Sequence, residues 1–295
     1  RMFREDFVWG VASSAYQVEG TDAADGRGAC VWDMFAADGR VFEHQNADTS
    51  CDHMHHYKED IALMRHLGIR AYRFSLNWAR ILPEGTGRVN EKAIAMYRDM
   101  ILTMKENGIT PYLTLFHWEF PQALYERGGW QNPDVVQWFG EYAKVVAENF
   151  SDICEYFITI NEPQCVVGLG HLSGVHAPGV KLPVAHHLLM AHGQAVINLR
   201  RYALRPVKIG FAPTGGVAYP YTDRPEDIEA AKKVYFGFYN PIDNWTWNVS
   251  WFSDPVFLGH YPEEGLKKFA PYLPKITQED MELIYQPLDF MGQNI

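Results

Sequence analysis

The sequence predicts an α/β protein in which parallel strands and helices alternate around a (β/α)8 barrel. Short runs of apolar, β-branched and aromatic residues, typical of buried strands, recur along the 295 residues. They are separated by longer segments whose apolar residues follow helical spacing. Polar side chains come directly after several of the strands. In a barrel the carboxyl ends of all strands meet at one mouth, whereas an open sheet gathers such residues only where its strand order reverses.

Six strands are expected, each ending at a turn, a polar residue or a proline. The first strand is not followed by the Gly-x-Gly-x-x-Gly turn that an open dinucleotide-binding sheet requires, which argues against that alternative. The expected strands cover residues 7–12, 69–75, 111–116, 155–162, 207–212 and 288–294.

Five helices are expected between the strands. Asn90 and the pair Asn132-Pro133 are predicted to begin the second and third helices, because asparagine caps a helix and its first turn tolerates proline. Residues 13–20 are expected to form a turn and residues 21–52 an irregular excursion. The expected helices cover residues 55–66, 90–107, 133–150, 182–203 and 225–238.

Six strands do not close a barrel of eight. The sequence therefore predicts an incomplete (β/α)8 TIM barrel of about six βα units, a single domain over residues 1–295 that lacks strands seven and eight. An open barrel leaves two sheet edges exposed, which favours aggregation. We expect the carboxy-terminal remainder of the barrel in the same, longer chain or in a second chain.

Composition excludes several kinds of partner. The net charge of −10 argues against nucleic acid and against an anionic membrane surface. No apolar run approaches the roughly 20 residues of a membrane span, and the amino terminus lacks the apolar segment of a signal peptide. The four cysteines form no Cys-x-x-Cys pair, which is typical of reduced thiols, so a cytoplasmic location is expected. No cofactor is expected.

One cluster has the short spacing of metal ligands, namely Cys51, His53, His55 and His56. Cysteine and histidine at such spacing can bind Zn²⁺, but the pattern does not supply the closed geometry of a structural zinc site. No metal is therefore expected.

Glu162 is the strongest candidate for chemistry. It follows Asn161 and precedes Pro163, which cannot continue a strand, so both polar residues lie at a strand's carboxyl end. A carboxylate at this place is typical of one half of a glycosidase acid/base pair, although it could instead cap the following helix. Three tryptophans of the last long segment either stack on a ligand or belong to the core: Trp245, Trp247 and Trp251.

Five motifs extend this interpretation along the whole chain. They are FVWGVASSAYQVEG at 7–20, YRFS at 72–75, FHW at 116–118, NEP at 161–163 and GVHAPG at 174–179. In this order and spacing they resemble the amino-terminal two-thirds of glycoside hydrolase family 1, the β-glucosidase family. The resemblance implies a (β/α)8 barrel and hydrolysis of terminal β-D-glycosyl residues with retention of configuration.

The resemblance also implies a role for each matching residue at the reacting centre. Glu162 would be the general acid/base, and Asn161 would bind the sugar 2-hydroxyl. Arg73 would lie under the nucleophile and keep it ionised, and Asn294 would line the same pocket.

Three further matches would bind the substrate. Gln17 and His117 would hydrogen-bond the hydroxyls of the sugar ring, with Trp118 beside them. The β-glycoside, as a glucoside or an oligosaccharide, is accordingly the expected small-molecule partner. The run from Asn161 to Cys165 favours plain β-glucosides over 6-phospho-β-glycosides.

Two departures from the family pattern limit the expectation. The family's nucleophile is a glutamate in a Thr-Glu-Asn-Gly motif on strand seven, which these 295 residues do not contain, and Thr214 stands where the family often has asparagine. We therefore expect the nucleophile outside this chain and the chain alone to be inactive. The alternative is a non-catalytic sugar-binding or scaffold fragment of the same fold.

Overall fold

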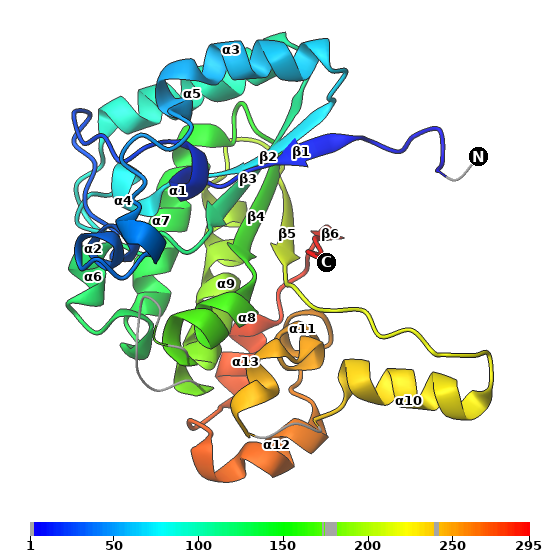
Figure 1. Cartoon of the computed structure of the whole chain (residues 1–295). Helices are drawn as coiled ribbons and strands as arrows, with labels where there is room; N and C mark the ends of the chain where they lie inside the picture. Colours follow the sequence, from blue (N-terminus) through cyan, green and yellow to red (C-terminus); the bar gives the residue numbers. More distant parts are fainter. Residues whose placement is uncertain (1–2, 173, 175–181, 239–241) are drawn as a thin grey trace.

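The computed structural model describes residues 3–172, 174, 182–238 and 242–295. Six parallel strands lie side by side in chain order in one sheet (Figure 1). Each strand pairs with the next one along the chain, so β1 and β6 form the two edges. The strands are β1 (Gly10–Ala12), β2 (Ala71–Ser75), β3 (Thr110–Phe116), β4 (Tyr156–Asn161), β5 (Lys208–Ala212) and β6 (Phe290–Met291).

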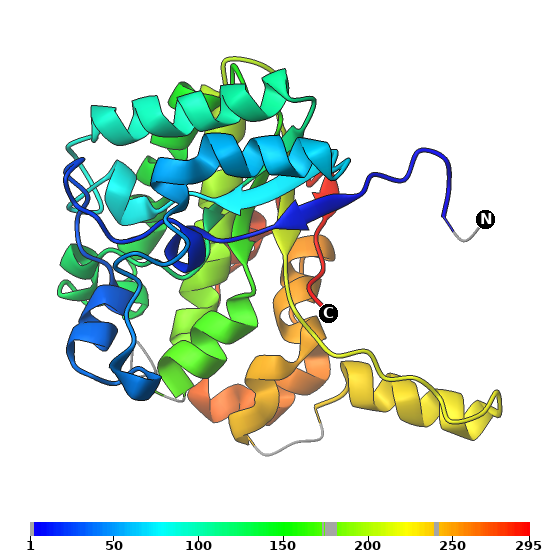
Figure 2. The ribbon, with the colours of Figure 1, turned by 45° about the horizontal axis from the view of Figure 1, so that its top comes forward.

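The long helices cover one face of this curled sheet. Neighbouring helices contact one another in order, α3 with α5, α5 with α7 and α7 with α9. This arrangement is an incomplete (β/α)8 barrel, as the sequence predicts, with the open side between β1 and β6 (Figure 2). The four helices are α3 (His53–His66), α5 (Glu91–Glu106), α7 (Val135–Phe150) and α9 (Leu182–Tyr202).

Most predicted elements are confirmed within a few residues, but the amino-terminal strand is shorter than expected. Only Gly10–Ala12 pairs with β2. Phe7 and Trp9 are exposed and pack on Phe3 and on each other, outside the sheet. The apolar run therefore predicted a strand that begins three residues too early. Ahead of Gly10, the Trp9 carbonyl oxygen still accepts the Arg70 N–H at 3.1 Å, but no further pairing with β2 is formed among the described residues.

The region after β1 is more helical than expected. The predicted turn at 13–20 contains the short helix α1 (Ala15–Val18), and the predicted excursion at 21–52 contains α2 (Val31–Ala37) and a single 3₁₀ turn, η1 (Phe42–His44). Helix α2 begins with a capping box in which the Asp33 side chain accepts the Cys30 backbone N–H. Cysteine is an unusual cap, so the pattern is hard to find in the sequence.

The two predicted asparagine caps differ from expectation. Asn90 does precede α5, but its side chain donates to the Arg80 carbonyl oxygen and does not cap the helix. The prediction for Asn132 is wrong, because α7 begins at Val135 after Asp134. The Asn132 side chain instead accepts the Asp134 N–H at 2.9 Å in the turn before the helix.

The long segment after β5 is mainly helical. Helix α10 (Pro225–Phe236) has no buried residue and extends away from the body of the molecule in both views (Figures 1 and 2). Trp245 and Trp251 are buried in the core, whereas Trp247 is 41% exposed. The other elements of this segment are η4 (Ile242–Trp247), α11 (Val249–Phe257), α12 (Glu263–Phe269), η5 (Ala270–Tyr272) and α13 (Gln278–Ile284). Short elements also follow the earlier strands: α4 (Trp78–Ile81), α6 (Gln122–Tyr125), η2 (Gly129–Gln131), α8 (Pro163–Cys165) and the π-helical turn η3 (Val166–Leu172).

Neither a membrane span nor a metal cluster is present in the described ranges. None of the helices there combines the length and apolar character that crossing a membrane requires. No three His, Cys, Asp or Glu side chains in those ranges are grouped to hold a metal ion. The histidines of the cluster weighed above pair with carboxylates instead, His53 with Asp60 and His55 with Asp52.

Candidate active site

Arg73, on β2, is the centre of a hydrogen-bonded group at the carboxyl ends of the strands. Its Nε donates to Thr114 Oγ1 at 3.0 Å, and its two Nη atoms donate to Asn161 Oδ1 at 2.5 Å and to Asn294 Oδ1 at 3.3 Å. Three strands and the segment after β6 thus meet at one guanidinium group. The structure brings together four of the predicted residues here, the fourth being Glu162.

Glu162 is held by its backbone and by its side chain. Its φ of 46° lies in the left-handed region, and its N–H donates to the Ala212 carbonyl oxygen at 2.7 Å. The carboxylate accepts a hydrogen bond from Asn294 Nδ2 at 2.8 Å. Glu162 precedes α8, but its side chain makes no capping hydrogen bond, so the helix-cap interpretation is not supported.

Arg73 and Glu162 interact electrostatically. Burial lowers the pKa of Arg73, and the nearby negative charge of Glu162 opposes this effect. The Cys165 thiol contacts the same carboxylate, and burial together with the Glu162 charge raises the pKa of Cys165 to about 12. This thiol is therefore protonated at neutral pH, and Arg73 supplies the positive charge of the site.

Asn161 is oriented by its neighbours. Its Oδ1 accepts from both Arg73 and Asn294, which fixes the amide so that Nδ2 is the free end. Asn161 is fully buried, and its Nδ2 has no hydrogen-bond partner among the described residues. A buried donor without a partner is a group that a ligand oxygen can satisfy.

The remaining predicted residues lie at a neighbouring cavity. Gln17, His117 and Trp118 line a volume of about 340 Å³ together with Tyr16 and Trp32. Burial, followed by the charge of Arg73, lowers the pKa of His117 to about 4, so the imidazole is neutral at physiological pH. A neutral imidazole offers one donor and one acceptor, which suits a hydroxyl group.

Trp118 connects the two groups of residues. Its indole Nε1 donates to the Asn161 carbonyl oxygen at 3.1 Å, and its ring lies beside that of His117 at 4.8 Å between centroids. The Trp118 φ of 82° turns the chain sharply after β3. Such backbone strain in a bulky residue is typical of functional sites.

The sequence did not single out three residues that support the site. Thr114 holds Arg73, and Ser75 and Glu119 accept backbone N–H groups of α1. Polar residues inside or directly after a buried strand were the available signal. A fifth quoted motif, at 174–179, lies outside the described residues apart from Gly174, whose carbonyl oxygen accepts from Arg40.

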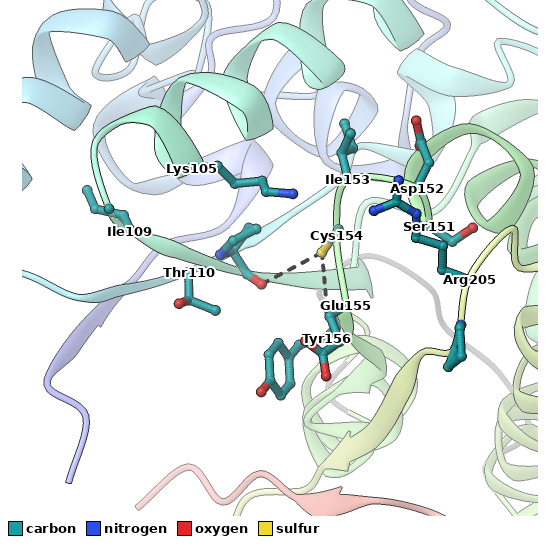
Figure 3. A pocket seen from close by; sticks show the side chains of 13 residues that line it. Lys105, Ile109, Thr110, Ser151, Asp152, Ile153, Cys154, Glu155, Tyr156 and Arg205 are labelled. Carbon is teal, nitrogen blue, oxygen red and sulfur yellow. Dashed lines mark hydrogen bonds between the residues drawn. The ribbon is translucent and has the colours of Figure 1, made fainter. Parts of the chain in front are cut away.

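A second cavity lies at the opposite, amino-terminal ends of β3 and β4 (Figure 3). It has a volume of about 540 Å³ and is lined by residues such as Thr110, Cys154 and Arg205, none of which belongs to the predicted site. Cys154 hydrogen-bonds the backbone oxygens of Pro111 and Tyr156 there. In barrels this face serves stability and the carboxyl-terminal face carries the chemistry, so we assign no role to this cavity.

The fold and the site define a barrel protein with a carboxylate, amides, an arginine and aromatic rings at its carboxyl-terminal mouth. The family model of glycosyl hydrolase family 1 matches residues 1–295. The chain belongs to this family.

Individual relatives agree with the assignment. A 1,4-beta-D-glucan glucohydrolase of Thermotoga neapolitana is 42% identical over 300 residues, which cover 100% of this chain and 68% of the relative. Beta-glucosidase A of Acetivibrio thermocellus is 41% identical, over 99% of this chain and 64% of its own.

The fold of a solved relative is also similar. The structure of beta-glucosidase from Thermotoga maritima in complex with glucoimidazole superposes with a TM-score of 0.87 at 41% identity, covering 99% of this chain and 65% of that chain. This chain therefore spans about two thirds of the length of the relatives it matches.

Proposed function

We propose that the protein containing this chain is a retaining β-glycoside hydrolase that removes terminal β-D-glucosyl-type residues, with Glu162 as the general acid/base. The observation that carries the proposal is the position of the Glu162 carboxylate. It accepts from Asn294 Nδ2, which also donates to Asn161 Oδ1, and it is close to the charge of Arg73. The names of the relatives, which are glucosidases and a glucohydrolase, support the substrate class.

Hydrolysis with retention needs two carboxyl groups about 5–5.5 Å apart. One attacks the anomeric carbon, while the other, here Glu162, donates a proton to the departing glycosidic oxygen. Glu162 then takes a proton from the water that releases the sugar. The attacking carboxylate lies outside residues 1–295 in this proposal, because they contain no Thr-Glu-Asn-Gly. Their one Glu-Asn-Gly, at 106–108, follows Lys105 and lies at the end of α5, before β3.

The other predicted residues bind the sugar in this proposal. Asn161 Nδ2 donates to the 2-hydroxyl, and Gln17 and the neutral His117 hydrogen-bond the other ring hydroxyls. Trp118 lies beside them and limits the cavity. Arg73 favours the ionised form of the attacking carboxylate, since a nearby positive charge lowers a carboxyl pKa.

The proposal extends to the form and location of the protein. Residues 1–295 make up one barrel domain whose strands seven and eight come from the same, longer chain or from a second chain. The location is cytoplasmic, which agrees with four free cysteines, of which Cys51 alone is exposed.

The test is Glu162→Gln in the whole protein that contains this chain. Without the proton donor, aryl β-glucosides with poor leaving groups should lose far more activity than those with good leaving groups, by a factor of roughly 10²–10⁴. Steady-state kcat/KM values over a series of leaving groups measure this difference. Glu155→Gln, at the other end of β4 and paired with Lys208, is the matched control.

An equal loss for good and poor leaving groups would contradict the acid role of Glu162. Complete absence of hydrolysis by the unsubstituted whole protein would instead favour the second candidate, a non-catalytic sugar-binding or scaffold fragment. Native mass measurement of the purified protein distinguishes a single 295-residue chain from a longer chain or a two-chain assembly.

A further inference from the structure

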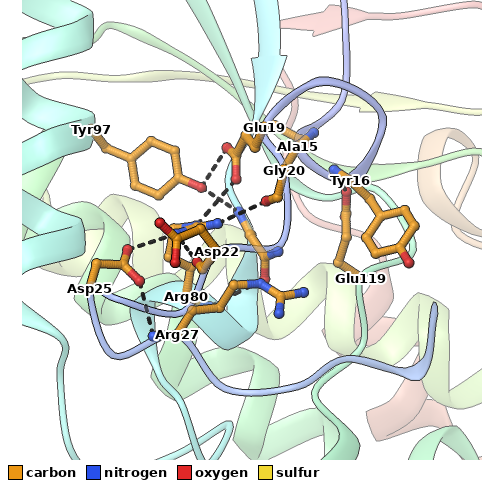
Figure 4. Close-up of polar contacts among 12 residues, drawn as sticks. Ala15, Tyr16, Glu19, Gly20, Asp22, Asp25, Arg27, Arg80, Tyr97 and Glu119 are labelled. Carbon is orange, nitrogen blue, oxygen red and sulfur yellow. Dashed lines mark hydrogen bonds and ion pairs between the residues drawn. The ribbon is translucent and has the colours of Figure 1, made fainter. Parts of the chain in front are cut away.

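Helix α1 carries Gln17 and is too short to be stable alone, because a four-residue helix closes hardly any hydrogen bonds of its own. Its first two N–H groups are bound by side chains from the ends of neighbouring strands. Ala15 donates to Ser75 Oγ at 2.7 Å, and Tyr16 donates to Glu119 Oε1 at 2.8 Å. Both acceptor residues are buried. Tyr16 and Glu119 lie side by side in Figure 4.

The other end of α1 is held by a separate buried group (Figure 4). The Glu19 carboxylate accepts from Tyr97 Oη at 2.7 Å, and its second oxygen lies 3.3 Å from Arg80 Nε. Arg80 also bonds Asp25 at 2.7 Å. This group anchors the chain after α1, whereas Ser75 and Glu119 hold the start of the helix.

The Gln17 side chain is not oriented by hydrogen bonds to other side chains in the described ranges. It is exposed and lines the cavity with His117 and Trp118. The direction of this side chain therefore depends on the backbone of α1. Glu119 is two residues from His117 in the chain, so one short segment after β3 carries His117 and also holds the helix that carries Gln17.

We propose that Glu119 is a positioning residue for sugar binding: its buried carboxyl group accepts the Tyr16 N–H and thereby fixes Gln17 relative to His117. The inference rests on the proposed function, in which Gln17 and His117 bind hydroxyls of the same sugar ring. Geometry of this kind matters because displacement of a binding group by about 1 Å can cost on the order of 10²-fold in rate.

Two substitutions at position 119 separate the hydrogen bond from the volume of the side chain. Glu119→Leu removes the acceptor at similar size, and Glu119→Gln keeps an oxygen that can accept the Tyr16 N–H. Ser151→Ala is the matched control, since Ser151 is also buried and accepts a backbone N–H, that of Leu204 at 2.7 Å, at the opposite end of the barrel.

The experiment is a double-mutant cycle with Gln17→Ala in the whole protein, measured as kcat/KM for an aryl β-glucoside. Glu119→Leu should lower kcat/KM roughly tenfold or more when Gln17 is present, and less than about twofold in the Gln17→Ala background. Glu119→Gln should stay within about threefold of the unsubstituted protein, and Ser151→Ala should leave kcat/KM unchanged although it destabilises the fold.

Additive effects of Glu119→Leu and Gln17→Ala would overturn the proposal, because they would show that Glu119 does not act through Gln17. A loss in Ser151→Ala as large as that in Glu119→Leu would overturn it as well. If the unsubstituted whole protein hydrolyses no β-glycoside, the proposed function fails, and the role of Glu119 in sugar binding fails with it. Hydrolysis with an additive cycle refutes the role of Glu119 alone.

Discussion

At the scale of single residues, burial sets the protonation state of side chains in the site and leaves one amide donor without a partner in the described ranges. Desolvation keeps His117 neutral, and the two hydrogen bonds to Asn161 Oδ1 leave its amide donor free. Desolvation has a larger effect at Glu119. Burial there raises the pKa of the carboxyl group from its ordinary value of 4.5 to about 8. A buried carboxyl group without an ion pair holds its proton at neutral pH.

This pKa predicts how stability depends on pH. The unfolded chain loses the Glu119 proton near pH 4.5, but the folded protein keeps it up to about pH 8. The contribution of Glu119 to the free energy of unfolding is therefore complete below pH 4.5. It falls progressively as the pH rises from there and is lost once the pH has passed through about 8. Glu119→Gln removes this loss, so its melting temperature should rise relative to that of the unsubstituted protein between pH 5 and pH 8.5.

Thermal unfolding at several pH values measures the difference. Glu141→Gln, on the exposed surface of α7, is the control for a change of charge alone. A difference between Glu119→Gln and the unsubstituted protein that stays constant over this pH range would mean that Glu119 is already ionised in the fold at pH 5.

At the scale of elements, the helices around the sheet pack closely against one another. Helix α9 lies against both α7 and α13, and Gly193 permits the second contact. A Cβ at Gly193 would lie only 1.9 Å from the Leu283 carbonyl oxygen, so α9 and α13 would have to separate. Backbone atoms cannot move aside as a flexible side chain can.

Gly193→Ala should therefore destabilise the protein by about 1–3 kcal/mol through overpacking. Urea or thermal unfolding gives the value. Gly216→Ala is the matched control, because no atom lies within 4 Å of its added Cβ. Equal stability of Gly193→Ala and Gly216→Ala would show that the two helices can separate at no cost.

At the scale of the whole molecule, the open side between β1 and β6 bears on the proposed mechanism. Residues 1–295 contain no Thr-Glu-Asn-Gly, and Glu162 makes no hydrogen bond or ion pair with a second carboxylate in the described ranges. A retaining mechanism needs that second group, and replacement of one member of such a catalytic set removes nearly all of the rate.

A purified polypeptide of residues 1–295 alone should therefore show no turnover of aryl β-glucosides. The measurement is product release under conditions in which the whole protein is active, with circular dichroism to verify that the short polypeptide is folded. Efficient hydrolysis by a polypeptide of verified mass would show that a carboxylate within these residues can serve as nucleophile.

The sequence predicted the fold well where local pattern and tertiary structure agree. Strands such as β3 and β4 are buried on both faces, so their continuous apolar runs are unambiguous. It was less successful at α1 and α2, which are short helices stabilised by Ser75, Glu119 and the Cys30–Asp33 cap. The acceptors that hold α1 are distant in sequence and leave no local signal, whereas the α2 cap is local but begins with cysteine, an unusual capping residue.

By itself the sequence determined the βα alternation, the six strands and the polar residues at the strand ends, because periodicity and strand-end polar residues are local properties. Only the tertiary structure decided which of these residues meet. Arg73, Asn161 and Asn294 come from distant parts of the chain and form one hydrogen-bonded group, with Glu162 attached through Asn294. Their contacts depend on parallel strands ending at the same mouth, and the burial that shifts the pKa values exists only once the helices cover the sheet.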